Sequence, residues 1–314
     1  MKKGITVHAS QNEETKNFRY YNQFWVKFID YLKTKFDVTE DTYFVDANRF
    51  FYNVNLFSQE AATPILECEM IIENNETHEF VVMSVSDVLT ASILNHNTNP
   101  KCKKIIFSQF DEPKLKRHLH GEKSFEKYSP WIYFPTNIFD IDKLYEQRKN
   151  IKEFVDKFCF WGTSLEERSI LSHFDKNYID WGPPIGEFDN YAKKLITYKA
   201  ALSISGRAEF CYRDVENFGL GTSILRFEYI NKMFNPLIPN YHYISVDRPD
   251  ELSIDRLGTS EHAQLLVNRF IEVKDNIDFL NYISNNARKY YEENLTMENS
   301  IKLTYNILKL NEWE

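Results

Sequence analysis

The sequence alternates, almost from end to end, between short apolar runs of strand length and longer segments whose apolar residues recur at helical spacing. In the first half the strand candidates lie at 4–10, 42–47, 65–72, 79–87 and 103–111. A helical pattern at 18–36 separates the first two. This alternation is typical of βαβ units, in which parallel strands form a sheet that helices cover. It predicts an α/β fold with parallel sheets.

The alternation pauses around residues 129–142, where two prolines precede a charged helical segment, and it then restarts. In the second half the strand candidates lie at 158–163, 178–184, 201–206, 223–227 and 242–246. We therefore expect an amino-terminal domain at 1–138 and a second α/β domain at 139–290, with 291–314 as a carboxyl-terminal helix that packs back on the first domain. One continuous domain with an insertion is the alternative.

Composition narrows the functional classes. The 314 residues are 43% hydrophobic and carry a net charge of −8, so we expect a sizeable core and no nucleic-acid surface, which would need a basic stripe. No stretch approaches the roughly 18–20 apolar residues that cross a bilayer, and no signal peptide is evident. The four cysteines are widely spaced without a zinc-binding pattern, as is typical of a reducing compartment. We expect a cytoplasmic protein.

The segment ISGRAEFCYRDVENFGLGT at 204–222 holds three of the nine glycines in the chain. The strand at 201–206 ends at Gly206, and parallel sheets bind ligands at the carboxyl ends of their strands. Gly206 and Arg207 would offer backbone N–H groups and a guanidinium at the start of a helix, which suits a phosphate. Gly219 is expected at the positive-φ position that ends this helix.

The helix itself is expected from about Ala208 to Phe218. Its period places Glu209, Arg213 and Glu216 together on the face turned away from the sheet. Two interpretations follow from this pattern. The three charged residues are either part of a ligand site or an ion-pair ladder on a solvent-exposed face.

Two segments of the second half, YKAALSISGRAEFCYRDVENFGLGTSILR at 198–226 and PLIPNYHYISV at 236–246, resemble the carboxyl-terminal half of glycosyltransferase family 90. That family includes cap-synthesis and protein O-glucosyl- or O-xylosyltransferase-like enzymes. The segment FCFWGTSLEERSILSHF at 158–174 and the turn at Trp181 and Gly182 fit the same pattern. The resemblance implies a GT-B architecture, in which two Rossmann-like domains face a cleft and the carboxyl-terminal domain holds a nucleotide sugar.

The resemblance also implies roles for individual residues. Arg207 and Arg213 would neutralise the diphosphate of the donor in place of a metal ion. Glu216 or Glu209 would accept hydrogen bonds from the ribose. The remaining donor-side residues are Gly162, Thr163, Gly206, His242 and Tyr243, of which the last two either flank the base or pack. The expected substrate is a UDP-linked sugar of the xylose or glucose type, transferred with inversion and without a cofactor to a hydroxyl of a glycan or glycoprotein.

An inverting transferase needs a base that deprotonates the acceptor hydroxyl. Asp87 and Asp111 close two strand candidates of the first half and are the catalytic candidates, with Asp46 a weaker third. An aspartate at such a position is also a common helix cap. His8, near the end of the first strand, is expected to line the acceptor side.

Three alternatives remain open. Asp140 and Asp142 form a DxD pattern that metal-dependent transferases use, although helix capping explains them as well. A non-catalytic nucleotide- or glycan-binding module of the same fold would lack a working base. A different two-domain enzyme, such as a sugar-phosphate epimerase or a phosphatase, has no supporting nucleophile motif or dinucleotide fingerprint in this chain.

Overall fold

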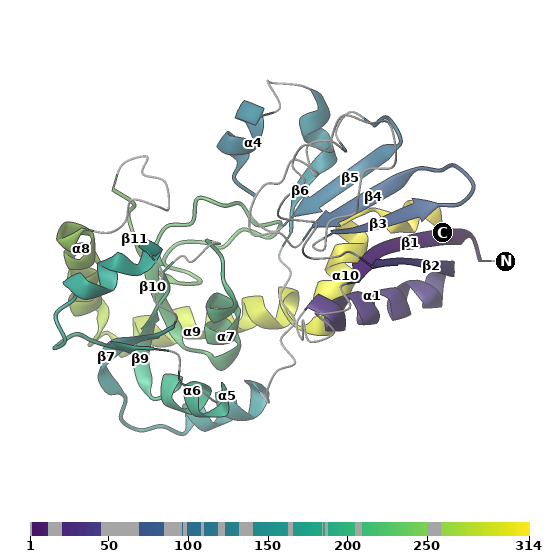
Figure 1. The fold of residues 1–314 in the computed structure, drawn as a ribbon. Helices are drawn as coiled ribbons and strands as arrows, with labels where there is room; N and C mark the ends of the chain where they lie inside the picture. Colours follow the sequence, from purple (N-terminus) through teal and green to yellow (C-terminus); the bar gives the residue numbers. More distant parts are fainter. Residues whose placement is uncertain are drawn as a thin grey trace. The chain divides into compact units, whose positions relative to one another are not determined.

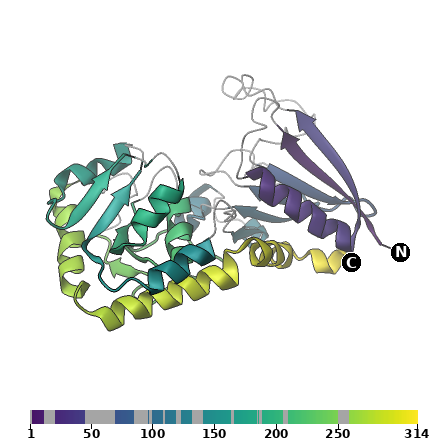
Figure 2. The ribbon, with the colours of Figure 1, turned by 90° about the horizontal axis from the view of Figure 1, so that it is seen from below.

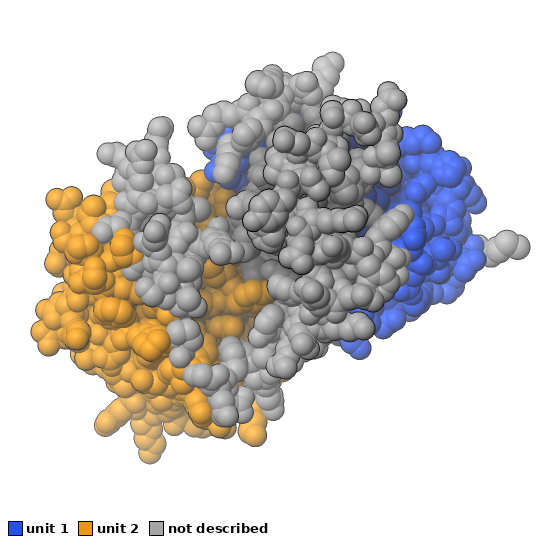
Figure 3. Space-filling model, in the orientation of Figure 1, with its two compact units in different colours: residues 1–135, 232–234, 297–314 blue, residues 136–231, 235–296 orange. Residues whose placement is uncertain are grey.

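The structure is a computed structural model that describes residues 2–11, 21–44, 69–84, 96, 99–107, 110–118, 123–131, 141–162, 166–183, 185, 188–204, 209–249 and 259–314. The chain divides into two compact units, coloured separately in Figure 3. Unit 1 comprises Met1–Pro135, Lys232–Phe234 and Met297–Glu314, and unit 2 comprises Thr136–Asn231 and Asn235–Thr296. Each unit has its own sheet with helices, so the predicted α/β fold class is confirmed.

Unit 1, in its described residues, is built on a six-stranded sheet of order β2-β1-β3-β4-β5-β6 (Figure 1). Its strands are β1 (Gly4–Gln11), β2 (Asp37–Phe44), β3 (Glu69–Asn74), β4 (Phe80–Ser84), β5 (Cys102–Phe107) and β6 (Tyr128–Pro130). Its α-helices are α1 (Tyr21–Lys35), α4 (Glu112–His118) and α10 (Met297–Ile307), and its 3-10 helices are η2 (Lys123–Lys127) and η5 (Leu310–Trp313).

The sheet of unit 1 is mixed, because β3 runs antiparallel to both β1 and β4 while the other pairs are parallel. The prediction of a parallel sheet was therefore wrong at β3. The Asn74 side chain accepts hydrogen bonds from the N–H groups of Glu76 and Thr77, at 2.9 and 3.1 Å, and forms a tight turn. A connection this short reverses the chain direction, since a parallel pair needs a crossover of about a dozen residues or more.

Helices α1 and α10 contribute to one hydrophobic core against this sheet (Figure 2). Ile5 and Val7 of β1 are buried in that core, whereas Thr6, between them, belongs to the opposite face, as the period of a strand requires. The indole nitrogen of Trp131 donates to the hydroxyl of Thr304 on α10, at 2.8 Å. The last α-helix of the chain is thus part of the core of unit 1.

Unit 2, in its described residues, contains a five-stranded sheet of order β11-β10-β9-β7-β8, and every pair in it is parallel. Its strands are β7 (Val155–Trp161), β8 (Ile179–Gly182), β9 (Tyr198–Leu202), β10 (Ser223–Phe227) and β11 (Ile244–Val246). Its helices are α5 (Ile141–Lys149), η3 (Glu166–His173), α6 (Phe188–Leu195), α7 (Tyr212–Leu220), α8 (Ser260–Val273) and α9 (Ile277–Asn294). Counted from β7, the order is 2-1-3-4-5, a doubly wound arrangement.

Helices cover both faces of this sheet (Figure 1). One core gathers residues of η3, α8 and α9 against β7, β9, β10 and β11, and the other gathers residues of α5, α6 and α7 against β7 and β9. Both faces being covered explains why the strands read as continuous apolar runs rather than alternating ones. Among the helices that the structure describes, none is long and apolar enough to cross a membrane.

Helix α7 begins and ends later than the sequence predicts. Its N-cap is Cys211, and Asp214 accepts a hydrogen bond from the Cys211 backbone N–H, at 2.7 Å, which fixes the first turn there. The positive-φ position after the helix is occupied by Gly221, with φ of 65°, and not by Gly219 as expected. The shift moves Gly219 inside the helix and leaves Glu209 outside it.

Two arginines of unit 2 close the amino edge of its sheet. The guanidinium of Arg148 on α5 donates to the backbone carbonyls of Ile196, Tyr198 and Gly221, which lie next to the starts of β9 and β10. Burial lowers the pKa of Arg148 to about 10. Arg288 on α9 donates to the carbonyl of Gly219 and pairs with carboxylates. These side chains satisfy carbonyls that the helices and strands leave open at their ends.

Candidate functional site

The carboxyl edge of the unit 2 sheet contains a topological switch point between β7 and β9. These strands are neighbours in the sheet but are not consecutive in the chain, because β8 lies on the other side of β7. The connections that leave β7 and β9 therefore turn to opposite sides and open a crevice at their carboxyl ends, where doubly wound sheets bind ligands. Gly162 directly follows β7, and α7, which carries Arg213, follows β9.

Arg213 extends its guanidinium over the end of β7. The guanidinium carbon lies 4.3 Å from the centroid of the Phe160 ring, and Nη2 is 3.5 Å from the Trp161 carbonyl oxygen. The Nε and Nη1 atoms are buried and make no hydrogen bond within the described part of the chain. Buried N–H groups of a cation call for an acceptor, and an anionic ligand supplies one.

Gly162 makes room for this guanidinium. A Cβ atom at this position would lie 2.6 Å from Nη2 of Arg213, closer than any ordinary contact. The next glycine along the same edge, Gly182, has no such constraint, since its Cβ would meet Trp161 at 3.7 Å. Two residues that the sequence singled out independently, Gly162 and Arg213, are thus brought into contact.

Glu216 lies one turn after Arg213 on α7. Burial raises its pKa to about 7, against the opposing influence of the Arg213 charge and of a hydrogen bond from Tyr191. Glu216 therefore exchanges between its charged and neutral forms near neutral pH, and the Tyr191 hydroxyl is a hydrogen-bond partner of both Glu216 and Arg213. Tyr191, on α6, was not singled out from the sequence.

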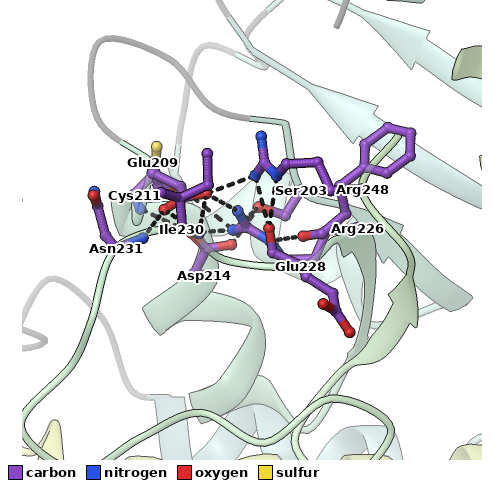
Figure 4. Close-up of polar contacts among 10 residues, drawn as sticks. Ser203, Glu209, Cys211, Asp214, Arg226, Glu228, Ile230, Asn231 and Arg248 are labelled. Atoms are coloured by element: carbon purple, nitrogen blue, oxygen red, sulfur yellow. Dashed lines mark hydrogen bonds and ion pairs between the residues drawn. The ribbon is translucent and has the colours of Figure 1, made fainter. Parts of the chain in front are cut away.

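A buried polar network fixes the start of α7 relative to the strands (Figure 4). Asp214 is fully buried, accepts hydrogen bonds from the Ser203 hydroxyl and the Cys211 N–H, and has Nη1 of Arg226 at 3.6 Å. Ser203 follows β9 and Arg226 lies in β10, so three elements meet here. This network holds the helix that presents Arg213. The available sequence signal was Arg226 itself, a charged residue in an otherwise apolar strand.

Glu209 does not belong to the face that carries Arg213, and the ion-ladder interpretation was wrong. It precedes α7, is fully buried, and accepts hydrogen bonds from the N–H groups of Ile230 and Asn231, at 2.8 and 2.5 Å. The same carboxylate pairs with Arg248 at 2.7 Å. Its oxygens are occupied within the protein, which leaves Glu216 as the carboxylate beside Arg213.

His242 and Tyr243 precede β11 and both are buried. Nδ1 of His242 accepts a hydrogen bond from the Ile238 N–H at 2.8 Å, and burial lowers the pKa of this histidine to about 4. Its ring packs edge-to-face against Tyr290, at 5.0 Å between centroids. The ring of Tyr243 packs against Tyr229 at 5.1 Å. In the described residues these two side chains therefore pack, which was one of the two sequence interpretations.

The candidates of unit 1 are described only in part. Asp111 directly precedes α4, and its carbonyl accepts the Leu115 N–H at 2.9 Å, the position of a helix cap. His8 lies within β1, with its ring nitrogens 3.2 Å from carboxylate oxygens of Asp41 and Glu73. The predicted residues that lie outside the described ones are Asp46, Asp87, Asp140, Thr163, Gly206 and Arg207.

Asp142 of the DxD pattern is in the first turn of α5, where it pairs with Arg288. Its side chain is 80% exposed, and the pairing ties α5 to α9. Within the described ranges no group of three or more His, Cys, Asp or Glu side chains is placed to hold a metal ion. The geometry of Asp142 fits a structural ion pair.

Fold and site together define a two-unit α/β protein whose second unit places Arg213, with two buried nitrogens that make no hydrogen bond in the described residues, at a switch point. No protein-family model matches the chain, and no curated protein matches it. Solved structures do match: a glycosyltransferase from Rickettsia africae has a TM-score of 0.42 and 14% identity over 72% of this chain and 68% of that one.

Two other solved structures match the chain with similar identity and TM-score. HepE from Anabaena in complex with UDP-glucose has a TM-score of 0.44 and 11% identity over 71% of this chain and 67% of that one. Sucrose-phosphate synthase from Thermosynechococcus elongatus has a TM-score of 0.45 and 12% identity over 98% of this chain and 74% of that one. At these TM-scores a functional assignment rests on the residues of this chain.

Proposed function

We propose that this protein is a glycosyltransferase that moves a sugar of the glucose or xylose type from a UDP-linked donor to a hydroxyl of a glycan or glycoprotein. The observation that carries the proposal is the Arg213 guanidinium, which lies over the end of β7 with Nε and Nη1 buried and without a hydrogen bond in the described residues. The resemblance of the segments at 158–174, 198–226 and 236–246 to glycosyltransferase family 90 supplies the reaction class, and membership of that family is part of the proposal.

The chemistry of the donor explains why such an arginine is needed. When the bond between the anomeric carbon and the diphosphate breaks, the bonding electrons leave with the diphosphate, whose negative charge then increases. A guanidinium that is already in place stabilises this charge without a metal ion. Arg207 and the backbone at Gly206 would contribute further donors, and Glu216 would accept a hydrogen bond from the ribose.

For the acceptor we propose an inverting displacement. The acceptor oxygen attacks the anomeric carbon, its proton passes to a carboxylate, and the diphosphate departs from the opposite side of the sugar. Asp87 is the preferred base and Asp111 the alternative. One of the two variants Asp87→Asn and Asp111→Asn removes the base. That variant should lower the rate of sugar transfer by about 100-fold or more and leave UDP binding intact.

Calorimetric titration with UDP, GDP and CMP, with and without EDTA, tests the part of the proposal that concerns donor binding. UDP should bind in both conditions, and Arg213→Gln should weaken it about 10- to 100-fold, the effect of one charge-assisted hydrogen-bonding group. Lys289→Gln, which removes an exposed charge from α9, is the matched control and should bind as the wild type does.

Three outcomes would contradict the proposal. Absence of binding to every nucleotide would overturn it. Binding that EDTA abolishes would favour the metal-dependent alternative with Asp140 and Asp142. Binding of UDP without transfer to any acceptor, and without release of UDP from its sugars, would favour a non-catalytic binding module.

A further inference from the structure

A second arginine, Arg248, lies at the same edge of the unit 2 sheet, just after β11. Its Nε and Nη2 atoms donate to the carbonyl of Glu228, at 3.1 and 2.7 Å, and Nη2 also pairs with Oε1 of Glu209 at 2.7 Å. The side chain is 10% exposed. Two nitrogens of the guanidinium are thus fixed by a backbone carbonyl and a buried carboxylate, which sets the direction of the third.

Glu209, the residue that orients Arg248, is itself rigidly held. Its carboxylate accepts the N–H groups of Ile230 and Asn231, and Nη2 of Arg226 lies 3.7 Å from Oε1. The Arg226 guanidinium in turn stacks on the Tyr229 ring, with 3.2 Å to its centroid. A change at Glu209 would therefore act on the position of Arg248.

The neighbouring arginines differ in one respect. Every nitrogen of Arg226 faces an acceptor, since Nε donates to the Phe227 carbonyl at 2.9 Å, Nη1 faces Ser203 Oγ at 3.4 Å, and Nη2 faces Glu209. Nη1 of Arg248 is buried and has no acceptor in the described residues. Figure 4 shows this nitrogen directed away from the other labelled side chains. A donor on a buried cation that the described residues leave unmatched is available to an acceptor atom of a ligand.

The charges of the cluster agree with this interpretation. Arg226 and Arg248 are balanced by Glu209 and Asp214, and all four are at most 10% exposed. The balance accounts for how two cations are kept buried. It does not account for the open N–H of Arg248, which needs a hydrogen-bond acceptor rather than a further counter-charge.

We propose that Arg248 is a second anion contact of the donor site, whose Nη1 donates to an oxyanion of the nucleotide sugar, and that Glu209 is its positioning residue. The inference rests on the proposed donor function. Arg213 lies over the end of β7 and Arg248 follows β11, so the two arginines flank β9 and β10 along one edge. The oxyanion belongs either to the diphosphate or to a carboxylate on the sugar.

Titration of the wild type and Arg248→Lys with UDP, UDP-glucose and UDP-glucuronate tests the proposal. Lysine keeps a positive charge for Glu209 but lacks the planar fork that points Nη1 outward. Arg248→Lys should keep a melting temperature close to that of the wild type and bind more weakly by about tenfold. Equal weakening for all three ligands identifies a diphosphate contact, and weakening for UDP-glucuronate alone identifies a sugar carboxylate.

The double variant Glu209→Gln with Arg248→Gln separates binding from stability. Arg248→Gln alone leaves Arg226 to balance both Glu209 and Asp214 and should lower the melting temperature, and the double variant should recover most of that loss. Affinity should stay reduced in both. Recovery of affinity together with stability would show that Arg248 is only a structural partner of Glu209.

Two further results distinguish failure of the inference about Arg248 from failure of the proposed function. If the wild type binds UDP, Arg213→Gln weakens that binding and the Arg248 variants bind all three ligands as the wild type does, the inference about Arg248 fails while the proposed function stands. If the wild type binds none of the three ligands, the proposed function fails and Arg248 loses its role with it.

Discussion

The two edges of the unit 2 sheet each bury arginine side chains, but they use them differently. At the amino edge, Arg148 donates to three backbone carbonyls that belong to fixed parts of the fold. At the carboxyl edge, Arg213 and Arg248 each keep buried N–H groups for which the described residues offer no acceptor. The same residue type therefore closes one edge of the sheet and, at the other edge, has buried nitrogens that make no hydrogen bond to the described residues.

This difference teaches that burial alone does not separate a structural arginine from a ligand-binding one. The matching of donors adds a second criterion, because a fold can satisfy every N–H of an arginine that has no ligand to accommodate. Position at the carboxyl edge is the third, since Nε of Arg269 on α8 is also buried without a hydrogen bond in the described residues. Glu209 illustrates the same point for an acid. It is fully buried, and its oxygens accept hydrogen bonds from two backbone N–H groups and an arginine. We therefore infer that its role is to position Arg248.

The largest effect on stability is expected at the amino edge. Arg148→Met removes the donor to three carbonyls at once and should lower the free energy of unfolding by about 3 kcal/mol or more. Urea denaturation measures this, with Lys149→Met, which changes the next and exposed residue, as the control. The affinity of the remaining folded protein for UDP should be unchanged. If Arg148→Met lost as much affinity for UDP as Arg213→Gln does, the two edges would not differ in function.

An intermediate effect is expected from Gly162→Ala at the carboxyl edge. The added Cβ would push Nη2 of Arg213 from its place, so UDP affinity should fall by about tenfold. The unfolding midpoint should fall only modestly, because Nη2 of Arg213 ends a flexible side chain, while the buried Phe160 ring, 3.1 Å from the added Cβ, must shift by a few tenths of an ångström. Gly182→Ala is a matched control, since its Cβ meets only an ordinary contact with Trp161. Equal affinities of the two variants would contradict the role given to Arg213.

The smallest effect concerns the pH dependence of UDP binding. Glu216, with its pKa raised to about 7, is neutral at pH 6 and charged at pH 8, where we expect its competition with the diphosphate for Arg213 to outweigh its gain as an acceptor for the ribose. Between these pH values the wild type should lose about threefold more affinity than Glu216→Gln does. Calorimetry of both proteins at the two pH values measures the difference, and parallel pH profiles would show that Glu216 does not act on Arg213.

The same group makes a prediction about stability. Because the pKa of Glu216 in the folded protein lies above the ordinary value of 4.5, its contribution to the free energy of unfolding is present below pH 4.5 and is lost as the pH rises through about 7. Denaturant unfolding between pH 5 and pH 8 should therefore show a smaller decline in Glu216→Gln than in the wild type.

The fold class followed from the sequence because local alternation of strand and helix patterns dictates layers of helices on sheets. The strand order did not, and β3 was assigned the wrong direction because a turn of a few residues carries less signal than two apolar runs. Gly162 and Arg213 could also be predicted from the sequence, since a glycine after a strand and a basic residue near a helix start are local features.

Other parts of the site depend on long-range contacts. Glu209 was assigned to a helix face because its spacing fits, whereas the capping of Cys211 by Asp214 starts the helix at Tyr212, four residues later than expected. Arg248 meets Glu209 across 39 residues of chain, which no local pattern reveals. A charged residue inside an apolar strand, such as Arg226, was the one available signal that a buried partner must exist elsewhere.

A crystal structure of the protein grown with UDP tests the central claim most directly. The account predicts that the diphosphate lies at the carboxyl ends of β7 and β9, with its oxygens within hydrogen-bonding distance of Nε and Nη1 of Arg213. The account would be contradicted if UDP bound elsewhere, for example at the amino edge beside Arg148, while Nε and Nη1 of Arg213 were hydrogen-bonded to protein atoms.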